Sequence, residues 1–290
     1  MIGEGFEQEG KYFNRLIRWT RQRIEFEGVP KHAAILLREW GMLHASTVDT
    51  PLTREGQDTA GMGDDLDEGT ARSARRSIAR INYMAQDRPD LGAAARVLSQ
   101  HMAQPKSGVI PVLKRVLRYL RKYPRGILKV TGVVEWIIEV FTDSDWAGDV
   151  ASRRSCSGGG LMIDSNLVHH WSKLQANVAL SSGEAELNAA VKGISEAIGM
   201  AELVKEVAGV EPRIRLHTDA NACRGMLLRQ GAGKVKHLSM KQFWVQGAIQ
   251  AYGIEVMKIA RSLNFADVLT HSVGREDLQK GMDAMGFLRG

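Results

Sequence analysis

The chain has 290 residues, a hydrophobic fraction of 44%, a charged fraction of 25% and a formal net charge of +6. This length allows one large domain or two modest ones, and the composition is ordinary for a soluble globular protein. No apolar run is long enough to cross a bilayer, and residues 1–10 have no signal-peptide character. The two cysteines, Cys156 and Cys223, match no metal spacing and exclude a disulfide framework. We therefore expect a cytoplasmic location and no membrane partner.

The positive charge is concentrated in one segment. Residues 91–134 contain no acidic residue at all. The same segment supplies nine cations, which are Arg96, Lys106, Lys114, Arg115, Arg118, Arg121, Lys122, Arg125 and Lys129. Because a solvated helix face usually mixes both signs of charge, this asymmetry favours a polyanionic partner, most simply a nucleic acid.

The first part of the chain is predicted to be mainly helical. Loose alternation over 12–27 predicts one or two short strands, and the acidic, glycine-rich segment 50–69 predicts a flexible surface connection. The spacing of apolar residues predicts helices over 31–40, 72–86, from 89 onward and over 109–123. Segment 124–132 is the predicted boundary to the second part.

One face of the helix predicted over 109–123 carries four cations. They are spaced three to four residues apart and therefore share one side of the helix: Lys114, Arg118, Arg121 and Lys122. We interpret them as contacts to a nucleic acid, and the alternative is a merely solvated face.

The second part alternates strands and helices. The patterns predict strands over 135–143, 157–164, 167–172, 213–218 and 254–260, and helices over 182–208, 220–228, 240–251 and from 265. This order is typical of an α/β protein with a layered sheet. The glycines 158–160 lie inside a strand pattern, which predicts close packing or a bulge rather than a phosphate loop.

Two of these strands end in the same dipeptide, Thr-Asp. The first ends at Asp143, and the second runs into Asp219. If the strands are neighbours, their two carboxylates meet at one edge of the sheet and repel each other unless protons or cations neutralise them. Oxygen ligands of this kind suit Mg²⁺, so the pattern predicts a metal site.

Six short segments surround this pair. They are FTDSDWAGD at 141–149, RRSCSG at 153–158, WSKLQ at 171–175, ALSSGEAE at 179–186, KH at 236–237 and ADVLT at 266–270. Together they resemble, in order and spacing, the ribonuclease H domain of copia-type LTR-retrotransposon Pol polyproteins. The resemblance implies a ribonuclease H-like α/β fold, with a mixed five-stranded sheet and flanking helices, preceded by a smaller, mainly helical polymerase-derived segment.

The first part resembles the end of the reverse transcriptase of the same family, on the segments 82–91 and 113–120. The resemblance implies a terminal reverse-transcriptase remnant at 1–131, a ribonuclease H domain at 132–274 and a C-terminal tail at 275–290. The aromatic-X-Asp-Asp motif of the polymerase is absent from the sequence. We therefore expect no DNA synthesis, and we expect the missing N-terminal polymerase part of the same polyprotein to be a partner.

The resemblance also implies a set of four catalytic carboxylates, and each falls on a matching position: Asp143, Glu186, Asp219 and Asp267. Such a set would hold two Mg²⁺ ions, with Mn²⁺ able to substitute. The implied reaction is hydrolysis of the RNA strand of an RNA–DNA hybrid during reverse transcription. The implied location is intracellular, including virus-like particles.

Three other acids near this set have structural interpretations. Ser181 lies three residues before Glu184, a spacing that predicts a capping box and leaves Glu186 for the metals. Asp145 and Asp149 are candidate extra ligands, but they lie past the predicted end of their strand, so we favour loop and turn roles for them.

Two further basic pairs are candidate phosphate contacts. Arg153 and Arg154 precede the glycine-rich strand, and Lys236 and His237 match a Lys-His pair of the family. For His237 the alternative is an ordinary surface histidine.

Two other functions remain open at this point. One is a catalytically decayed remnant that still binds hybrids, and the other is a DNA endonuclease or integrase of the same fold. The intact acids weigh against the first, and the polymerase-like segment weighs against the second.

Overall fold

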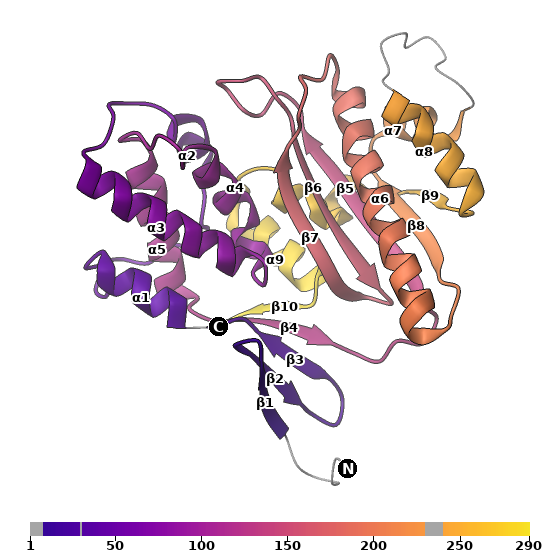
Figure 1. The fold of residues 1–290 in the computed structure, drawn as a ribbon, viewed down its shortest axis with the longest axis horizontal. Helices are drawn as coiled ribbons and strands as arrows, with labels where there is room; N and C mark the ends of the chain where they lie inside the picture. The colour runs from indigo at the N-terminus through magenta and orange to yellow at the C-terminus, as the bar shows by residue number, and fades with distance from the viewer. Residues whose placement is uncertain (1–7, 30, 230–239) are drawn as a thin grey trace. The chain divides into compact units, whose positions relative to one another are not determined.

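The computed structural model describes residues 8–29, 31–229 and 240–290. The chain divides into two compact units, each described here by itself (Figure 1). Unit 1 comprises 1–132 and 271–290, and unit 2 comprises 133–270. No helix within the described ranges is long and apolar enough to cross a membrane.

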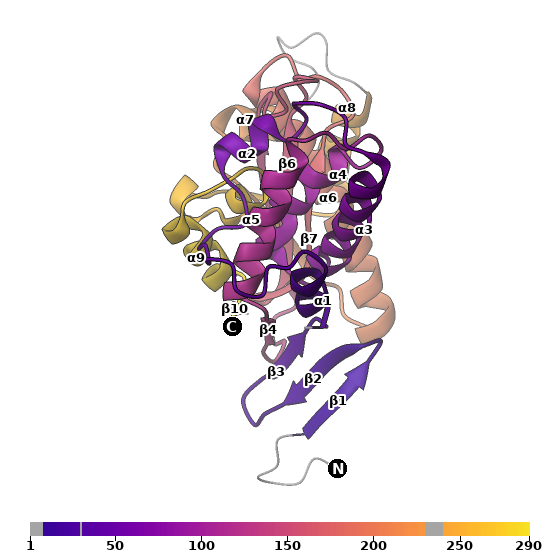
Figure 2. The same cartoon turned by 90° about the vertical axis from the view of Figure 1, so that its left-hand side faces the viewer.

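Unit 1 combines a small sheet with a group of helices. Its first elements are β1 (Gln8–Tyr12), β2 (Arg15–Trp19), β3 (Ile24–Glu27), α1 (Lys31–Glu39), α2 (Arg54–Thr59) and α3 (Glu68–Ala85). They are followed by η1 (Pro89–Leu91), α4 (Gly92–Gln100), α5 (Val109–Lys122), β4 (Gly126–Val130), α9 (Arg275–Ala284) and β10 (Phe287–Arg289). The strands pair antiparallel in the order β1-β2-β3-β4-β10. In Figure 2, β1 to β3 lie below α1, α3 and α5 of the same unit.

The helices of unit 1 form because each has one apolar face to bury. In α5 the apolar residues recur every three to four positions, and Val112, Leu113, Val116, Leu117 and Leu120 are all buried. The predicted bounds of this helix hold to within one residue.

One expectation for unit 1 was wrong. The segment 50–69 is not a flexible connection, because it contains α2, whose first turn is capped by Thr53 Oγ1 accepting from the Gly56 N–H at 3.2 Å. The predicted boundary 124–132 includes β4, which pairs with β3 on one side, and the division between the two units follows directly after Gly132. The segment predicted as a C-terminal tail, 275–290, contains α9 and β10, and β10 pairs with the other side of β4. Short strands of this kind are stabilised by partners far away in sequence, which local patterns do not reveal.

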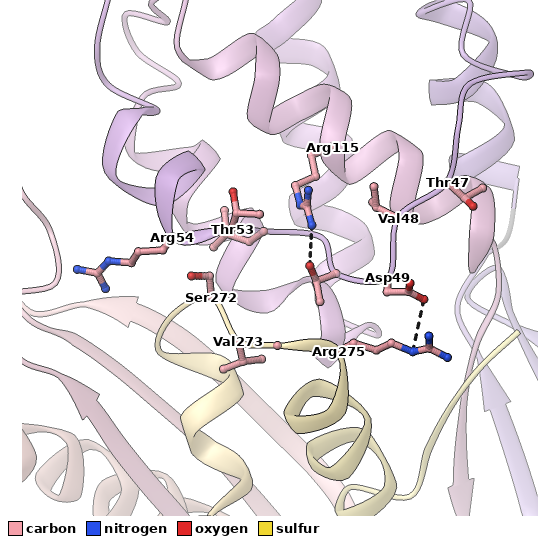
Figure 3. A pocket seen from close by; sticks show the side chains of 12 residues that line it. Thr47, Val48, Asp49, Thr53, Arg54, Arg115, Ser272, Val273 and Arg275 are labelled. Atoms are coloured by element: carbon pink, nitrogen blue, oxygen red, sulfur yellow. Dashed lines mark hydrogen bonds and ion pairs between the residues drawn. The ribbon is translucent and has the colours of Figure 1, made fainter.

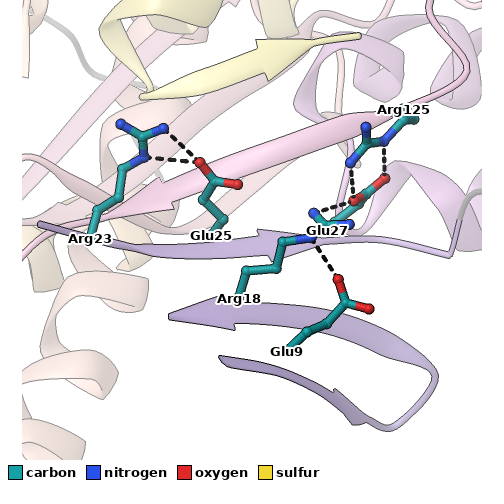
Figure 4. Close-up of polar contacts among 6 residues, drawn as sticks. All are labelled: Glu9, Arg18, Arg23, Glu25, Glu27 and Arg125. Atoms are coloured by element: carbon teal, nitrogen blue, oxygen red, sulfur yellow. Dashed lines mark hydrogen bonds and ion pairs between the residues drawn. The ribbon is translucent and has the colours of Figure 1, made fainter. Parts of the chain in front are cut away.

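Ion pairs cross the sheet of unit 1 (Figure 4). Glu27 is fully buried, and its carboxylate accepts hydrogen bonds from Arg18 at 2.7 Å and from Arg125 at 2.7 and 2.8 Å. Arg18 also donates to Glu9 on β1 at 2.9 Å. Burial opposes ionisation of Glu27, but the two guanidinium groups outweigh it and hold the pKa of Glu27 below its ordinary value. A buried acid is thus fully compensated.

Unit 2 is built on a mixed five-stranded sheet. Its strands are β5 (Ile137–Asp145), β6 (Cys156–Ile163), β7 (Asn166–Leu174), β8 (Arg213–Thr218) and β9 (Glu255–Lys258). Its helices are α6 (Ser182–Ala208), α7 (Asn221–Leu228), α8 (Met240–Ala251), η2 (Arg261–Leu263) and η3 (Phe265–Leu269). The strand order is β7-β6-β5-β8-β9, with β5, β6 and β7 antiparallel and with β8 parallel to both β5 and β9. This is the predicted ribonuclease H-like arrangement.

The core of unit 2 lies between the sheet and α6. Ile138 and Val140 of β5 pack with Ile194 and Ala197 of α6, and all four side chains are fully buried. The helix begins after Ser181 and ends at Gly209, which adopts a left-handed φ of 68°. These two end signals explain why the sequence predicted both of its bounds correctly.

The three glycines of β6 allow close packing on both faces of the sheet, as predicted. A Cβ at Gly160 would lie 2.4 Å from the ring of Phe265 in η3. A Cβ at Gly159 would lie 2.1 Å from the indole of Trp171 on the opposite face. The strand therefore lets η3 approach the sheet closely, and η3 carries Asp267.

Candidate metal centre

Three of the four predicted acids meet at the end of the two central strands. β5 and β8 run parallel, with Phe141 opposite His217, so Asp143 and Asp219 leave the sheet at the same edge. Glu186 reaches them from the second turn of α6. One carboxylate oxygen from each of the three residues lies within 4.8 Å of the others. The pairing of strand ends predicted from sequence is confirmed.

The fourth acid, Asp267, approaches the cluster from η3. An oxygen of Asp267 lies within 4.8 Å of an oxygen of Asp143. Asn264 fixes η3 at this place, because its Oδ1 accepts from the Ala266 N–H at 3.2 Å and its Nδ2 donates to the Thr142 carbonyl of β5 at 3.0 Å. Arg261 lies 3.5 Å from the carboxylate of Asp267. The structure thus gathers all four predicted carboxylates, with Asp143 at the centre of the group.

Two hydroxyl residues orient these acids, and the sequence did not single them out for that role. The Thr270 Oγ1 donates to Asp143 Oδ2 at 2.8 Å and also contacts the carbonyl oxygen of Asp267 at 2.8 Å. The Ser144 N–H and Oγ donate to Glu186 Oε1 at 3.1 and 2.8 Å. The only sequence signals were the position of Thr270 three residues after one acid and of Ser144 directly after another.

The electrostatics of Glu186 show that the cluster lacks positive charge. Its side chain is buried, and its Oε2 has no hydrogen-bond partner. Burial, and next the carboxylate of Asp143, raise the pKa of Glu186 to about 8, against the hydrogen bonds from Ser144. A buried carboxylate oxygen without a donor, beside two further carboxylates, fits a cation ligand. The donor set therefore suits one or more hard divalent cations.

The competing acids have the structural roles predicted for them. Glu184 belongs to the helix cap, since its N–H donates to Ser181 Oγ at 3.2 Å and its Oε2 accepts from the Leu180 N–H at 2.8 Å. Asp149 forms a turn, with its carboxylate accepting from the Ser152 N–H at 2.9 Å. The prediction that Asp145 lies past its strand was wrong, because β5 runs to Asp145, but its carbonyl oxygen does close a turn by accepting from the Gly148 N–H at 3.2 Å.

The predicted nucleic-acid contacts remain predictions, but the structure shows what several of them touch. On α5, Arg118 and Arg121 donate to the carbonyl oxygens of Ser46 and Leu43 at 2.8 Å each. Lys122 forms an ion pair with Asp49. These three side chains hold the segment 43–49 and are not merely solvated, whereas Lys114 is exposed.

The basic residues of unit 2 are less constrained. Arg153 is exposed, and Arg154 donates through Nε to Ser152 Oγ at 3.2 Å. Lys236 and His237 lie outside the described residues. The structure therefore does not test whether these four residues form one nucleic-acid contact surface.

The strand order and the acidic edge define the class: unit 2 is a ribonuclease H-like α/β domain with a candidate metal centre. No protein-family model matches the chain. Its sequence is 26% identical over 279 residues to the Retrovirus-related Pol polyprotein from transposon TNT 1-94 of Nicotiana tabacum, which covers 94% of this chain and 21% of that protein. It is 28% identical over 261 residues to the Pol polyprotein from transposon RE2 of Arabidopsis thaliana, which covers 88% of this chain and 17% of that protein.

A shorter relative is more similar. The chain is 40% identical over 134 residues to Secreted RxLR effector protein 161 of Plasmopara viticola, covering 46% of this chain and 94% of that protein. The chain belongs to the same family as that protein, and its more distant relatives include the Pol polyproteins of plant copia-type retrotransposons. The chain spans about a fifth of the length of the Pol polyproteins that it matches.

Solved structures include two of LC11-RNase H1, a protein isolated from compost. One is similar with a TM-score of 0.37 and 18% identity, covering 51% of this chain and 99% of that one. The other, crystallised in complex with an RNA/DNA hybrid, has a TM-score of 0.35 and 16% identity, covering 46% of this chain and 93% of that one. At these scores the likeness places no individual residue.

Proposed function

We propose that the chain hydrolyses the RNA strand of RNA–DNA hybrids as the ribonuclease H part of a retrotransposon Pol polyprotein. The observation that carries the proposal is the convergence of Asp143, Glu186, Asp219 and Asp267 at one edge of the sheet of unit 2. Four carboxylates from four separate parts of the chain, one of them with a buried oxygen that no donor reaches, have no structural use that would offset their repulsion.

The four carboxylates would hold two Mg²⁺ ions, and Mn²⁺ has the same preference for oxygen ligands. When bound, such ions activate a water molecule and stabilise the oxygen that leaves the phosphodiester. The protein's own task is to keep its acids ionised and aligned. Thr270 holds one oxygen of Asp143, and Ser144 holds one oxygen of Glu186, whose Oε2 has no hydrogen-bond partner. Glu186 would give up its proton on binding of a cation, because the raised pKa reflects burial and like charge.

The choice of substrate rests on the relatives. Pol polyproteins are retrovirus-related, and reverse transcription produces RNA–DNA hybrids. Hybrids with A-form character expose 2′-hydroxyl groups in a wide minor groove, which lets a protein separate RNA from DNA. We further propose that unit 1 derives from the end of the polymerase and that the remaining polyprotein supplies the other partner.

The test is cleavage by the purified chain of end-labelled RNA–DNA hybrid, duplex DNA and duplex RNA, with Mg²⁺ or with chelator. We expect cutting of the RNA strand of the hybrid alone, and only with Mg²⁺. Asp143→Asn should abolish cutting, whereas the matched variant Asp145→Asn, two residues further along the chain, should keep it. Equal cutting of duplex DNA would favour a DNA endonuclease of the same fold, and tight hybrid binding without any cutting would indicate a decayed remnant.

A further inference from the structure

A second group of uncompensated charge lies in unit 1, in a pocket of about 610 Å³. The pocket is lined by the segment 47–54, by Arg115 of α5 and by residues 272–275 (Figure 3). Arg54, Arg115 and Arg275 stand against a single acid in this lining, Asp49. The excess of positive charge is the first sign of an anion site.

Arg115 is the centre of the pocket. Its guanidinium donates to Thr50 Oγ1 at 2.8 Å. Its Nε is shielded from solvent and has no hydrogen-bond partner. No carboxylate in the described part of the chain pairs with it. Burial, and next the neighbouring Arg118, lower the pKa of Arg115, which shows that its surroundings disfavour the charge.

The acids near the pocket are already engaged. Asp49 pairs with Lys122 and lies 3.7 Å from Arg275, and Asp58 pairs with Arg54 at 3.2 Å. Neither carboxylate therefore compensates Arg115. Arg275 keeps most of its side chain in solvent and can turn toward a ligand.

Two other shielded arginines of unit 1 have carboxylate partners. Arg88 is buried, and Asp90 receives two of its hydrogen bonds at 2.9 and 2.7 Å. Arg15 donates to both oxygens of Asp87 at 2.9 and 3.0 Å. Removing a charge from water costs free energy unless a partner of opposite sign is present, so Arg115, unlike Arg88 and Arg15, calls for an external partner.

We propose that this pocket binds a phosphate group, with Arg115 as the main ligand and Arg275 as a second, and that the phosphate belongs to the backbone of a nucleic acid. The planar guanidinium offers parallel donors that match two oxygens of a phosphate. The choice of a nucleic acid over a free phosphate compound rests on the proposed function. Phosphate chemistry is common to both sources, and the experiment separates them.

The experiment compares the wild-type chain with Arg115→Gln and with Arg76→Gln, always in chelator so that no cleavage occurs. Arg76 is an exposed arginine of α3 in the same unit and provides the matched loss of charge. The first arm measures the melting temperature in inorganic phosphate against chloride at equal ionic strength. The second arm measures the affinity for RNA–DNA hybrid as a function of salt.

We expect phosphate to raise the melting temperature of the wild type and of Arg76→Gln but not of Arg115→Gln. Hybrid affinity should fall roughly tenfold in Arg115→Gln, and the salt dependence should flatten by about 0.9 in slope, as expected for one lost phosphate contact. Arg115→Lys, which keeps the charge without the planar fork, should lie between the two and guards against a folding defect.

Two results overturn all or part of the proposal. A phosphate effect that depends on Arg115 together with unchanged hybrid affinity means that the source is a free phosphate compound and not a nucleic acid. The absence of any difference between Arg115→Gln and Arg76→Gln in both arms overturns the site altogether. A chain that passes both arms but cuts no hybrid in Mg²⁺ contradicts the proposed ribonuclease function alone.

Discussion

The acidic edge of unit 2 carries an excess of negative charge, and the Arg115 pocket of unit 1 carries an excess of positive charge. Each includes a shielded polar atom without a hydrogen-bond partner, Glu186 Oε2 in one and Arg115 Nε in the other. At Glu27, by contrast, the chain compensates a buried charge with Arg18 and Arg125. We therefore expect a ligand of opposite sign at both the acidic edge and the Arg115 pocket.

The two regions also differ in how clearly the sequence pattern indicates them. Asp143 lies near the end of β5 and Asp219 directly follows β8, so their pattern was visible. Arg115 was not among the predicted nucleic-acid contacts, which included Arg118 and Arg121. It became distinct only in the fold, where Arg118 and Arg121 are engaged with backbone carbonyl groups.

The largest expected effect concerns Glu186 at the acidic edge of unit 2. The pKa of Glu186 is raised from 4.5 to about 8, so the folded state holds this proton more tightly than the unfolded chain does. In chelator, stability should therefore fall as the pH rises from about 4.5 to about 8, by something on the order of 3 kcal/mol. Glu186→Gln should remove this pH dependence and abolish cleavage. Denaturant unfolding at several pH values checks it, and an unchanged pH dependence in the variant would contradict the assignment.

A smaller effect is expected from the residue that orients Asp143. Thr270→Val keeps the shape of the side chain but deletes the donor to Asp143 Oδ2. Activity or Mg²⁺ affinity should drop about 10- to 100-fold, as is usual for groups that orient metal ligands. Thr270→Ser should restore most of it, and the loss should shrink at high Mg²⁺. A loss that the serine variant does not relieve would point to packing instead.

The smallest effect concerns a compensated charge. Glu27→Gln should destabilise unit 1 by about 1–2 kcal/mol, a low figure for a buried acid because Arg18 and Arg125 are partly solvated. The pKa of Glu27 is lowered, so its contribution is present above pH 4.5 and is lost as the pH falls through the folded value. Glu25→Gln, the neighbouring acid paired with Arg23, should cost less than about 0.5 kcal/mol. Urea unfolding measures the loss of stability in both variants, and equal losses would contradict the special role of Glu27.

Much of unit 2 could be predicted because its signals are local. The bounds of α6 follow from a serine cap, a long apolar period and a left-handed glycine, and β8 follows from strict alternation. Unit 1 was harder to predict. Helix α2 is polar and has only six residues, and β10 has three residues that are stabilised by pairing with β4. Thr270 and Ser144 escaped prediction for the same reason, because a hydroxyl acquires its role only from the acid that it faces in the fold.

The most direct test of the metal centre is the thermal melting of the wild type, Asp219→Asn and Asp145→Asn, each in chelator and in saturating Mg²⁺. Asp219 is in the cluster and Asp145 is not. In chelator, Asp219→Asn should be more stable than the wild type by about 0.5–2 kcal/mol, because it relieves repulsion between carboxylates. Mg²⁺ should raise the melting temperature of the wild type and of Asp145→Asn and should leave Asp219→Asn nearly unchanged, since only an intact site gains stability from the ion. Matching responses of the two variants to Mg²⁺ would contradict the placement of the metals on these carboxylates.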